Sequence, residues 1–141
     1  MILRRTFLTA ALLSGLALQG AAQSLPLSPA IGIHSTITAQ IDAFRADDFP
    51  RAFSYASPTL RKVFRTPDNF RAMVQFGYPM VWKPADLRFL ELREAGGLYW
   101  QRVMITDAAG DVYLLDYQMI RCAEGWRINA VQPLPILEPA V

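Results

Sequence analysis

The side chains in this sequence of 141 residues that could carry out acid–base chemistry include 12 aspartates and glutamates but only one histidine. The stretch Tyr113–Ile120 (YLLDYQMI) is typical of a strand and holds a single acid, Asp116, among mostly apolar residues. General acid–base catalysis needs such a carboxylate to be desolvated and close to a substrate. Asp116 is therefore either an acid in a pocket or one half of an ion pair on the outer surface of a sheet. The strand register decides between the two.

The remaining reactive side chains do not have the spacing of a catalytic or metal site. His34 is the only histidine, and we interpret it as structural or exposed. Cys122 is the only cysteine, which excludes an intramolecular disulfide and indicates a buried, inert thiol. One histidine and one distant cysteine give no metal-ligand pattern, and neither a glycine-rich phosphate loop nor a serine elbow is present. We expect no metal and no cofactor.

The first 22 residues have the three-part plan of a secretory signal peptide. A basic pair, Arg4 and Arg5, precedes an apolar run that is too short to span a bilayer, and the small residues at 20–22 follow. The order Arg-Arg-Thr-Phe-Leu resembles a twin-arginine export signal. The alternative is an ordinary secretory signal that carries two arginines. Either route predicts a periplasmic or secreted protein that meets the membrane only during export.

Removal of this segment balances the charge of the chain. Two of the 14 Lys and Arg residues lie in the signal, so 12 remain against 12 Asp and Glu. No basic cluster suggests a phosphate-binding surface, and we expect no nucleic-acid partner.

Helices come first in the mature chain. After a flexible linker over 23–32, an apolar stripe predicts an amphipathic helix over Ile33–Arg45. Asp48 is expected to cap a second helix, and Ser57-Pro58 and Thr66-Pro67 to open two more, because a capping side chain followed by proline is a helix start signal. A proline-bounded aromatic connector over 78–84 follows.

Strands separated by glycine-containing turns make up the second half. They are expected over Leu87–Glu94, Leu98–Asp107, Val112–Cys122 and Trp126–Pro133. Helices followed by a four-stranded antiparallel meander define an α+β domain over 33–133, with an extended tail over 134–141.

The chain resembles a known superfamily in this order of elements. A helical half, an aromatic connector, a meander and a last strand of the type Gly-Trp-Arg-Ile-Asn (125–129) resemble the nuclear transport factor 2-like superfamily. More narrowly, DDFPRAFSYASP, FGYPMVW and EGWRIN resemble a bacterial domain-of-unknown-function family, number 4864. The superfamily resemblance implies a cone, in which helices close the concave face of a curved sheet and often leave a cavity.

Two turns predict the strand register. A two-residue turn at Gly96-Gly97 places Glu91 opposite Arg102, and a three-residue loop over 108–110 places Arg102 opposite Asp116. Opposite charges that face each other across antiparallel strands stabilise the pairing by about 0.2–1 kcal/mol. The register therefore favours the ion pair over the pocket acid.

The same register sorts the other side chains into two faces. The more apolar face should meet the helices and contains Arg88, Leu90, Leu92, Gln101, Val103, Ile105, Tyr113, Leu115, Tyr117 and Met119. The outer face should carry the charged row together with Phe89, Arg93, Trp100, Met104, Leu114 and Gln118. Because Trp100 and Met104 would be exposed there, we expect a homodimer through this outer face.

Two turns are possible in the last hairpin. A two-residue turn at Glu124-Gly125 would put Trp126 and Ile128 on the core face, whereas a three-residue loop over 123–125 would put them outside. The first buries more apolar area and is favoured.

The candidate ligand-binding residues are the polar and aromatic members of the inner wall, namely Arg88, Gln101, Tyr117, Tyr55, Tyr78 and Trp82. This mixture suits an apolar or amphipathic molecule with one or two polar groups. The alternative is a filled core in which the tyrosine hydroxyls bond to the backbone.

The superfamily also contains ketosteroid isomerases and polyketide cyclases, which depend on an acid or histidine inside the cone. No carboxylate here falls on the inner face, and Glu94 lies at a strand end. We therefore expect a non-catalytic module that binds a small molecule or a protein. A small isomerase, dehydratase or cyclase is the alternative.

Overall fold

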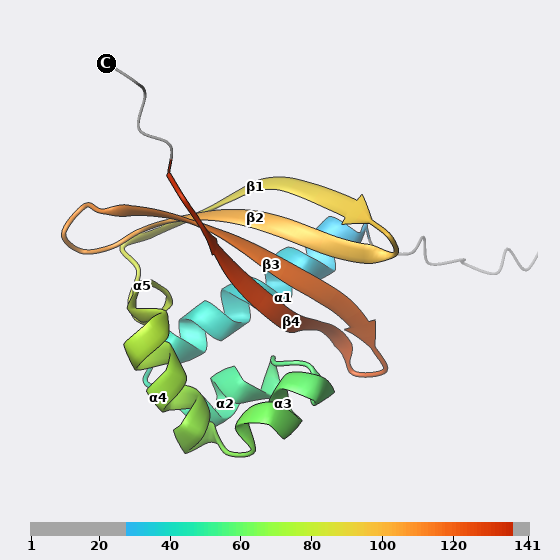
Figure 1. The fold of residues 1–141 in the computed structure, drawn as a ribbon, viewed down its shortest axis with the longest axis horizontal. Coiled ribbons are helices and arrows are strands. Elements are labelled where there is room, and N and C mark those ends of the chain that lie inside the picture. The colour runs from blue at the N-terminus through green and yellow to red at the C-terminus, as the bar shows by residue number, and fades with distance from the viewer. Residues whose placement is uncertain (1–27, 137–141) are drawn as a thin grey trace, which may run out of the picture.

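The structure is a computed structural model that describes residues 28–136, so the predicted signal peptide lies outside the described residues. Five helices precede four strands within these residues (Figure 1). The helices are α1 (Pro29–Arg45), α2 (Phe49–Ser54), α3 (Pro58–Phe64), α4 (Pro67–Gly77) and α5 (Pro79–Trp82). The strands are β1 (Asp86–Ala95), β2 (Leu98–Thr106), β3 (Val112–Cys122) and β4 (Gly125–Leu134).

The helices begin where local capping chemistry predicts. The side chains of Asp48, Ser57 and Thr66 accept hydrogen bonds from the backbone N–H three residues later, and a proline lies in the first turn of each helix. Two boundaries differ from the prediction. Helix α1 begins at Pro29 rather than Ile33, since Pro29 supplies a start signal of its own, and the aromatic connector contains the short helix α5.

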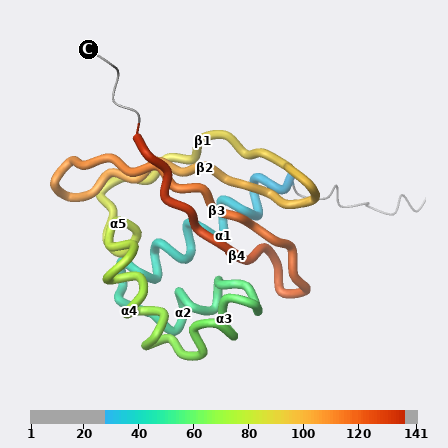
Figure 2. The backbone as a smooth tube through the Cα atoms, in the orientation of Figure 1, coloured from blue at the N-terminus to red at the C-terminus, as the bar shows by residue number. Residues whose placement is uncertain are grey.

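The strands form one antiparallel sheet in the order β1-β2-β3-β4, so the predicted meander is confirmed. All five helices lie on one side of this twisted sheet (Figures 1 and 2). The apolar stripe of α1 packs between the sheet and the shorter helices, with Ile33, Ile37 and Ile41 fully buried. The α+β class is thus confirmed.

A β-bulge in β1 changes the predicted faces of three residues. The turn at Gly96-Gly97 pairs Ala95 with Leu98 as expected, but the register shifts between Phe89 and Leu92. One extra residue reverses the face of every residue before it. Phe89 therefore points to the core, whereas Arg88 lies outside. The predictions for Arg88, Phe89 and Leu90 were wrong, and Leu90 is exposed.

The other two hairpins keep the expected faces. Arg102 lies opposite Asp116, which confirms the loop over 108–110. In the last hairpin Cys122 pairs with Gly125, so the two-residue turn consists of residues 123 and 124 rather than 124 and 125. Trp126 and Ile128 nevertheless join the core face. The observed turn moves the pairing by two residues relative to the predicted turn, and a shift of two residues leaves each side chain on the same face of the sheet.

A second bulge lies in β4, where Asn129 is the extra residue between Ile128 and Ala130. Its side-chain oxygen accepts from Ser57 Oγ at 2.8 Å, and its amide donates to Gln118 Oε1 at 2.7 Å. Ile128 also exchanges backbone hydrogen bonds with Tyr55 and Ser57. The start of α3 is thereby fastened to the free edge of β4.

Helix α1 approaches the sheet closely at Gly32, where a Cβ atom would overlap the Trp126 indole. Gly32→Ala is expected to lower the free energy of unfolding by about 1 kcal/mol, because overpacking costs about 1–3 kcal/mol and helix propensity returns up to about 1. Urea unfolding measures the change. Gly77→Ala is the matched control, since nothing lies within 4 Å of its added Cβ. A gain in stability for both variants would contradict the predicted close packing.

Candidate functional site

An apolar cavity of about 250 Å³ lies between the helices and the inner face of β3 and β4. Its helical wall consists largely of apolar side chains from α1, α3 and α4, namely Phe44, Leu60, Phe64, Phe70, Met73 and Val74. The sheet contributes Tyr117, Ile128, Asn129, Ala130 and Val131. An engineered apolar cavity of about 150 Å³ binds benzene, so this space is large enough for a small organic molecule.

Most polar groups of the cavity wall already have hydrogen-bond partners inside the protein. The Tyr78 hydroxyl donates to the carbonyl of Val131 at 3.0 Å, and the Gln40 amide donates to the carbonyl of Ala52 at 3.1 Å. Asn129 uses both ends of its side chain, as described for the β4 bulge. These bonds hold the wall in place and leave the groups less able to bond to a ligand.

Tyr117 is the most deeply buried polar residue of the wall, with 1% of its surface exposed. Burial, and next the neighbouring Tyr78, raise the pKa of its hydroxyl far above the ordinary value. Removing the proton would leave a negative charge in an apolar environment, which is costly. The hydroxyl therefore stays neutral and keeps its proton throughout the physiological pH range.

Two of the six predicted ligand-binding residues, Tyr78 and Tyr117, line the cavity. Tyr55 lies beneath the Arg127 guanidinium, whose central carbon is 5.8 Å from the centre of the Tyr55 ring. Trp82 donates a hydrogen bond from Nε1 to Asp47 Oδ1 at 2.7 Å. Arg88 lies on the outer face and pairs with Asp86 at 3.3 Å, with 68% of its side chain exposed. The bulge in β1 is the physical reason why Arg88 does not reach the cavity.

Gln101 faces inward as predicted, but it binds backbone groups at the β1 bulge and does not line the cavity. It is fully buried, and its Nε2 donates to the carbonyls of Leu90 at 3.1 Å and Arg102 at 2.8 Å. Its Oε1 therefore accepts, so His34 Nε2 carries the proton of the 3.0 Å bond that joins them. The His34 ring also stacks on Phe89 at 3.9 Å. His34 thus has a structural role, as expected.

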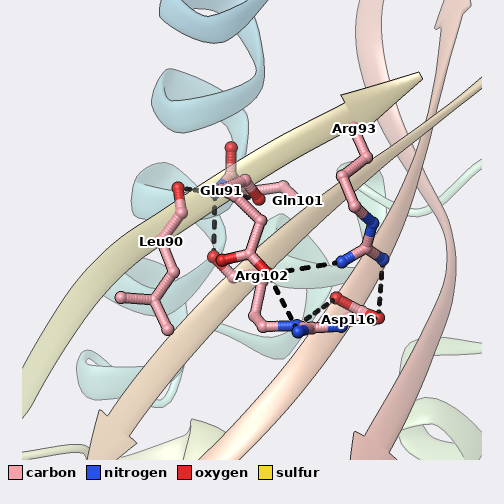
Figure 3. A network of polar contacts seen from close by, with 6 residues as sticks. All are labelled: Leu90, Glu91, Arg93, Gln101, Arg102 and Asp116. Atoms are coloured by element: carbon pink, nitrogen blue, oxygen red, sulfur yellow. Dashed lines mark hydrogen bonds and ion pairs between the residues drawn. The ribbon is translucent and has the colours of Figure 1, made fainter.

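Asp116 belongs to an ion-pair network on the outer face (Figure 3). Arg93 and Arg102 donate to its carboxylate at 2.9 and 3.2 Å, and Arg102 also reaches Glu91 at 2.8 Å. The predicted pairing is confirmed, yet the Asp116 side chain is only 7% exposed, because the two arginines cover it. Burial raises the pKa of Asp116, but hydrogen bonds from Arg102 and Arg93 outweigh it and hold the pKa below its ordinary value.

The cavity wall has little capacity for catalysis. Among the described residues that line it, no aspartate, glutamate, histidine, lysine, arginine or cysteine is present. Glu94 lies exposed in β1, and no cluster of three or more potential metal ligands occurs within residues 28–136. The polar groups that remain in the wall are the tyrosine hydroxyls and the side-chain amides of Gln40 and Asn129. Such groups form hydrogen bonds but do not gain or lose protons near neutral pH.

Sequence reasoning missed two polar residues of the wall, Gln40 and Asn129. Gln40 lies three residues after Ile37 and four before Phe44, so a polar side chain within the apolar stripe of α1 was the available signal. Asn129 is placed by a bulge that depends on pairing with a distant strand, and no local signal marks it.

The fold and cavity define an α+β protein with a small apolar pocket between its helices and its sheet. The family described as Domain of unknown function (DUF4864) matches residues 28–141, and the chain belongs to this family. No curated protein and no solved structure matches the chain. No helix of the described region is long and apolar enough to cross a membrane.

Proposed function

We propose that this chain is an exported, non-catalytic module that binds a small apolar or amphipathic molecule. The observation that carries the proposal is the 250 Å³ cavity, whose lining is mostly apolar and holds no acid, base or nucleophile stronger than tyrosine among the described residues. Small-molecule sites are mostly apolar, with a few placed polar groups, and this cavity of about 250 Å³ is slightly smaller than their usual range of about 300–1,000 Å³. The basic and apolar character of residues 1–22 supports export.

Helices on one face of a four-stranded meander also support a nuclear transport factor 2-like cone. An isomerase, dehydratase or cyclase of that superfamily would need a desolvated acid or base near its substrate. Asp116 and His34, the acid and the base considered for such a role, are engaged in structural contacts, and neither lines the cavity. Binding is therefore the better supported function.

Association through the outer sheet face stays a prediction. Trp100, Met104 and Leu114 are half-buried there rather than fully exposed, and the arginine network covers the neighbouring surface. A homodimer through this face is tested by sedimentation at high protein concentration, where a strictly monomeric chain would contradict it.

Filling the cavity should abolish binding. Leu60→Trp places an indole where the leucine lines the cavity, so the variant should retain no small molecule that co-purifies with the wild-type protein. Native mass spectrometry of protein exported by its own host measures retention. Val63→Trp, on the same helix but 64% exposed, is the matched control and should retain the molecule as the wild type does. Equal retention by both variants would place the bound molecule elsewhere.

A further inference from the structure

The Tyr117 hydroxyl is the polar group of the cavity wall that has no role in the fold. No hydrogen bond joins it to another group within residues 28–136, although the residue is 99% buried, as its exposure of 1% shows. Its oxygen is not among the fully enclosed side-chain atoms that lack a partner, so it keeps a small accessible surface, and a group without a partner inside the protein is free to bond to a ligand. Because Tyr117 lines the cavity, a molecule inside the cavity can supply that partner.

The hydroxyl is suited to donate a hydrogen bond. Its pKa is raised, so the O–H proton is retained at every physiological pH. The neighbouring Tyr78 gives its own proton to the carbonyl of Val131 and does not compete as a donor. The wall thus presents one free O–H donor on a largely apolar surface.

The charge of the ligand follows from the same wall. No cationic or anionic side chain lines the cavity among the described residues, so an ionised ligand would lose part of its hydration without gaining a counter-charge. An uncharged oxygen acceptor avoids this cost and satisfies the tyrosine. The volume of about 250 Å³ suits one ring with a short substituent, given that about 150 Å³ holds benzene.

We propose that the ligand is an uncharged, largely apolar molecule that carries a carbonyl or comparable acceptor oxygen, and that Tyr117 binds this oxygen through its hydroxyl. This inference rests on the proposed binding function and names the chemistry of its ligand. Tyr117 is the residue that confers selectivity for an oxygen-containing ligand over a hydrocarbon of the same shape.

Three probes of similar shape test the proposal by calorimetric titration: acetophenone, cumene and benzoate. Tyr117→Phe should weaken acetophenone binding by about 3- to 10-fold, as expected for one hydrogen bond, and leave cumene binding unchanged or tighter. Benzoate should bind more weakly than acetophenone to the wild type. Tyr113→Phe is the matched control on the same strand, because its hydroxyl bonds to Asp107 outside the cavity and its loss should alter no affinity.

The outcomes separate the two proposals. If cumene and acetophenone bind but Tyr117→Phe weakens neither, or if benzoate binds as tightly as acetophenone, the ligand inference is overturned while the binding function stands. If neither cumene nor acetophenone binds the wild type, the binding function itself fails. The melting temperature of ligand-free Tyr117→Phe gives a second test. It should equal or exceed that of the wild type, and a fall of several degrees would reveal a partner within the protein.

Discussion

Asp116→Asn is expected to lower the free energy of unfolding by about 2–3 kcal/mol. The substitution removes the charge that both Arg93 and Arg102 contact, and breaking a buried pair leaves the remaining charges without compensation. The loss stays below the upper range for fully buried pairs because 38% of Arg93 and 29% of Arg102 remain exposed to water. Urea unfolding at neutral pH measures the change.

Asp86→Asn provides the matched control on the same face of the sheet. Asp86 pairs with Arg88 at 3.3 Å, but both side chains are more than half exposed. Such surface pairs contribute about 0–1 kcal/mol. If the two substitutions cost the same, the burial of Asp116 beneath the arginines would have no energetic consequence, contrary to our interpretation.

The same network predicts a pH dependence. The pKa of Asp116 is lower in the folded protein than in the unfolded chain, where it is about 3.9. The carboxylate therefore contributes its full stabilisation above the unfolded value and loses it as the pH falls through the folded value. The difference in stability between the wild type and Asp116→Asn should shrink below about pH 4. A difference that stays constant down to pH 2 would contradict this.

Gln101→Met is expected to cost about 2–4 kcal/mol of folding stability, although it keeps the length of the side chain. The amide satisfies the carbonyls of Leu90 and Arg102 and the ring nitrogen of His34 within a fully buried site. Each buried polar group left without a partner costs about 1–3 kcal/mol. Urea unfolding measures the loss, and hydrogen exchange should show faster opening around the bulge.

Gln132→Met is the matched control, because Gln132 is exposed in β4 and the same substitution there should change stability by less than about 0.5 kcal/mol. A second substitution, His34→Phe, should cost little further stability in the Gln101→Met background, because both substitutions remove the same hydrogen bond between His34 and Gln101. Fully additive losses would show that the histidine and the glutamine stabilise the fold independently.

The candidate site was predictable only in part. Tyr78 and Tyr117 follow from the connector and from the alternation of β3, and both line the cavity. The turn at Gly96-Gly97 is correct, but counting back from it without a bulge predicts that Arg88 faces inward. The bulge between that turn and Arg88 places Arg88 on the outer face. Gln40 and Asn129 entered the wall through packing that no short stretch of sequence reveals.

Features that depend on interactions between residues close together in the chain follow from the order of residues alone. Capping side chains followed by prolines set the starts of α2, α3 and α4, and the apolar stripe of α1 chose its buried face. Glycine-containing turns set two hairpin registers and with them the pairing of Arg102 with Asp116. Each of these choices depends on local backbone geometry and side-chain spacing, which the chain carries in its order of residues.

The positions of the two bulges and of the cavity depend instead on contacts between distant parts of the chain. The β1 bulge is held by Gln101 from the neighbouring strand, and the β4 bulge by Ser57 and Gln118 through Asn129. The cavity is the space left between the short helices and β3 and β4, so it depends on how distant elements fill the interior. Contacts between residues far apart in the chain have no local signature, which is why the unpartnered Tyr117 hydroxyl became visible only in three dimensions.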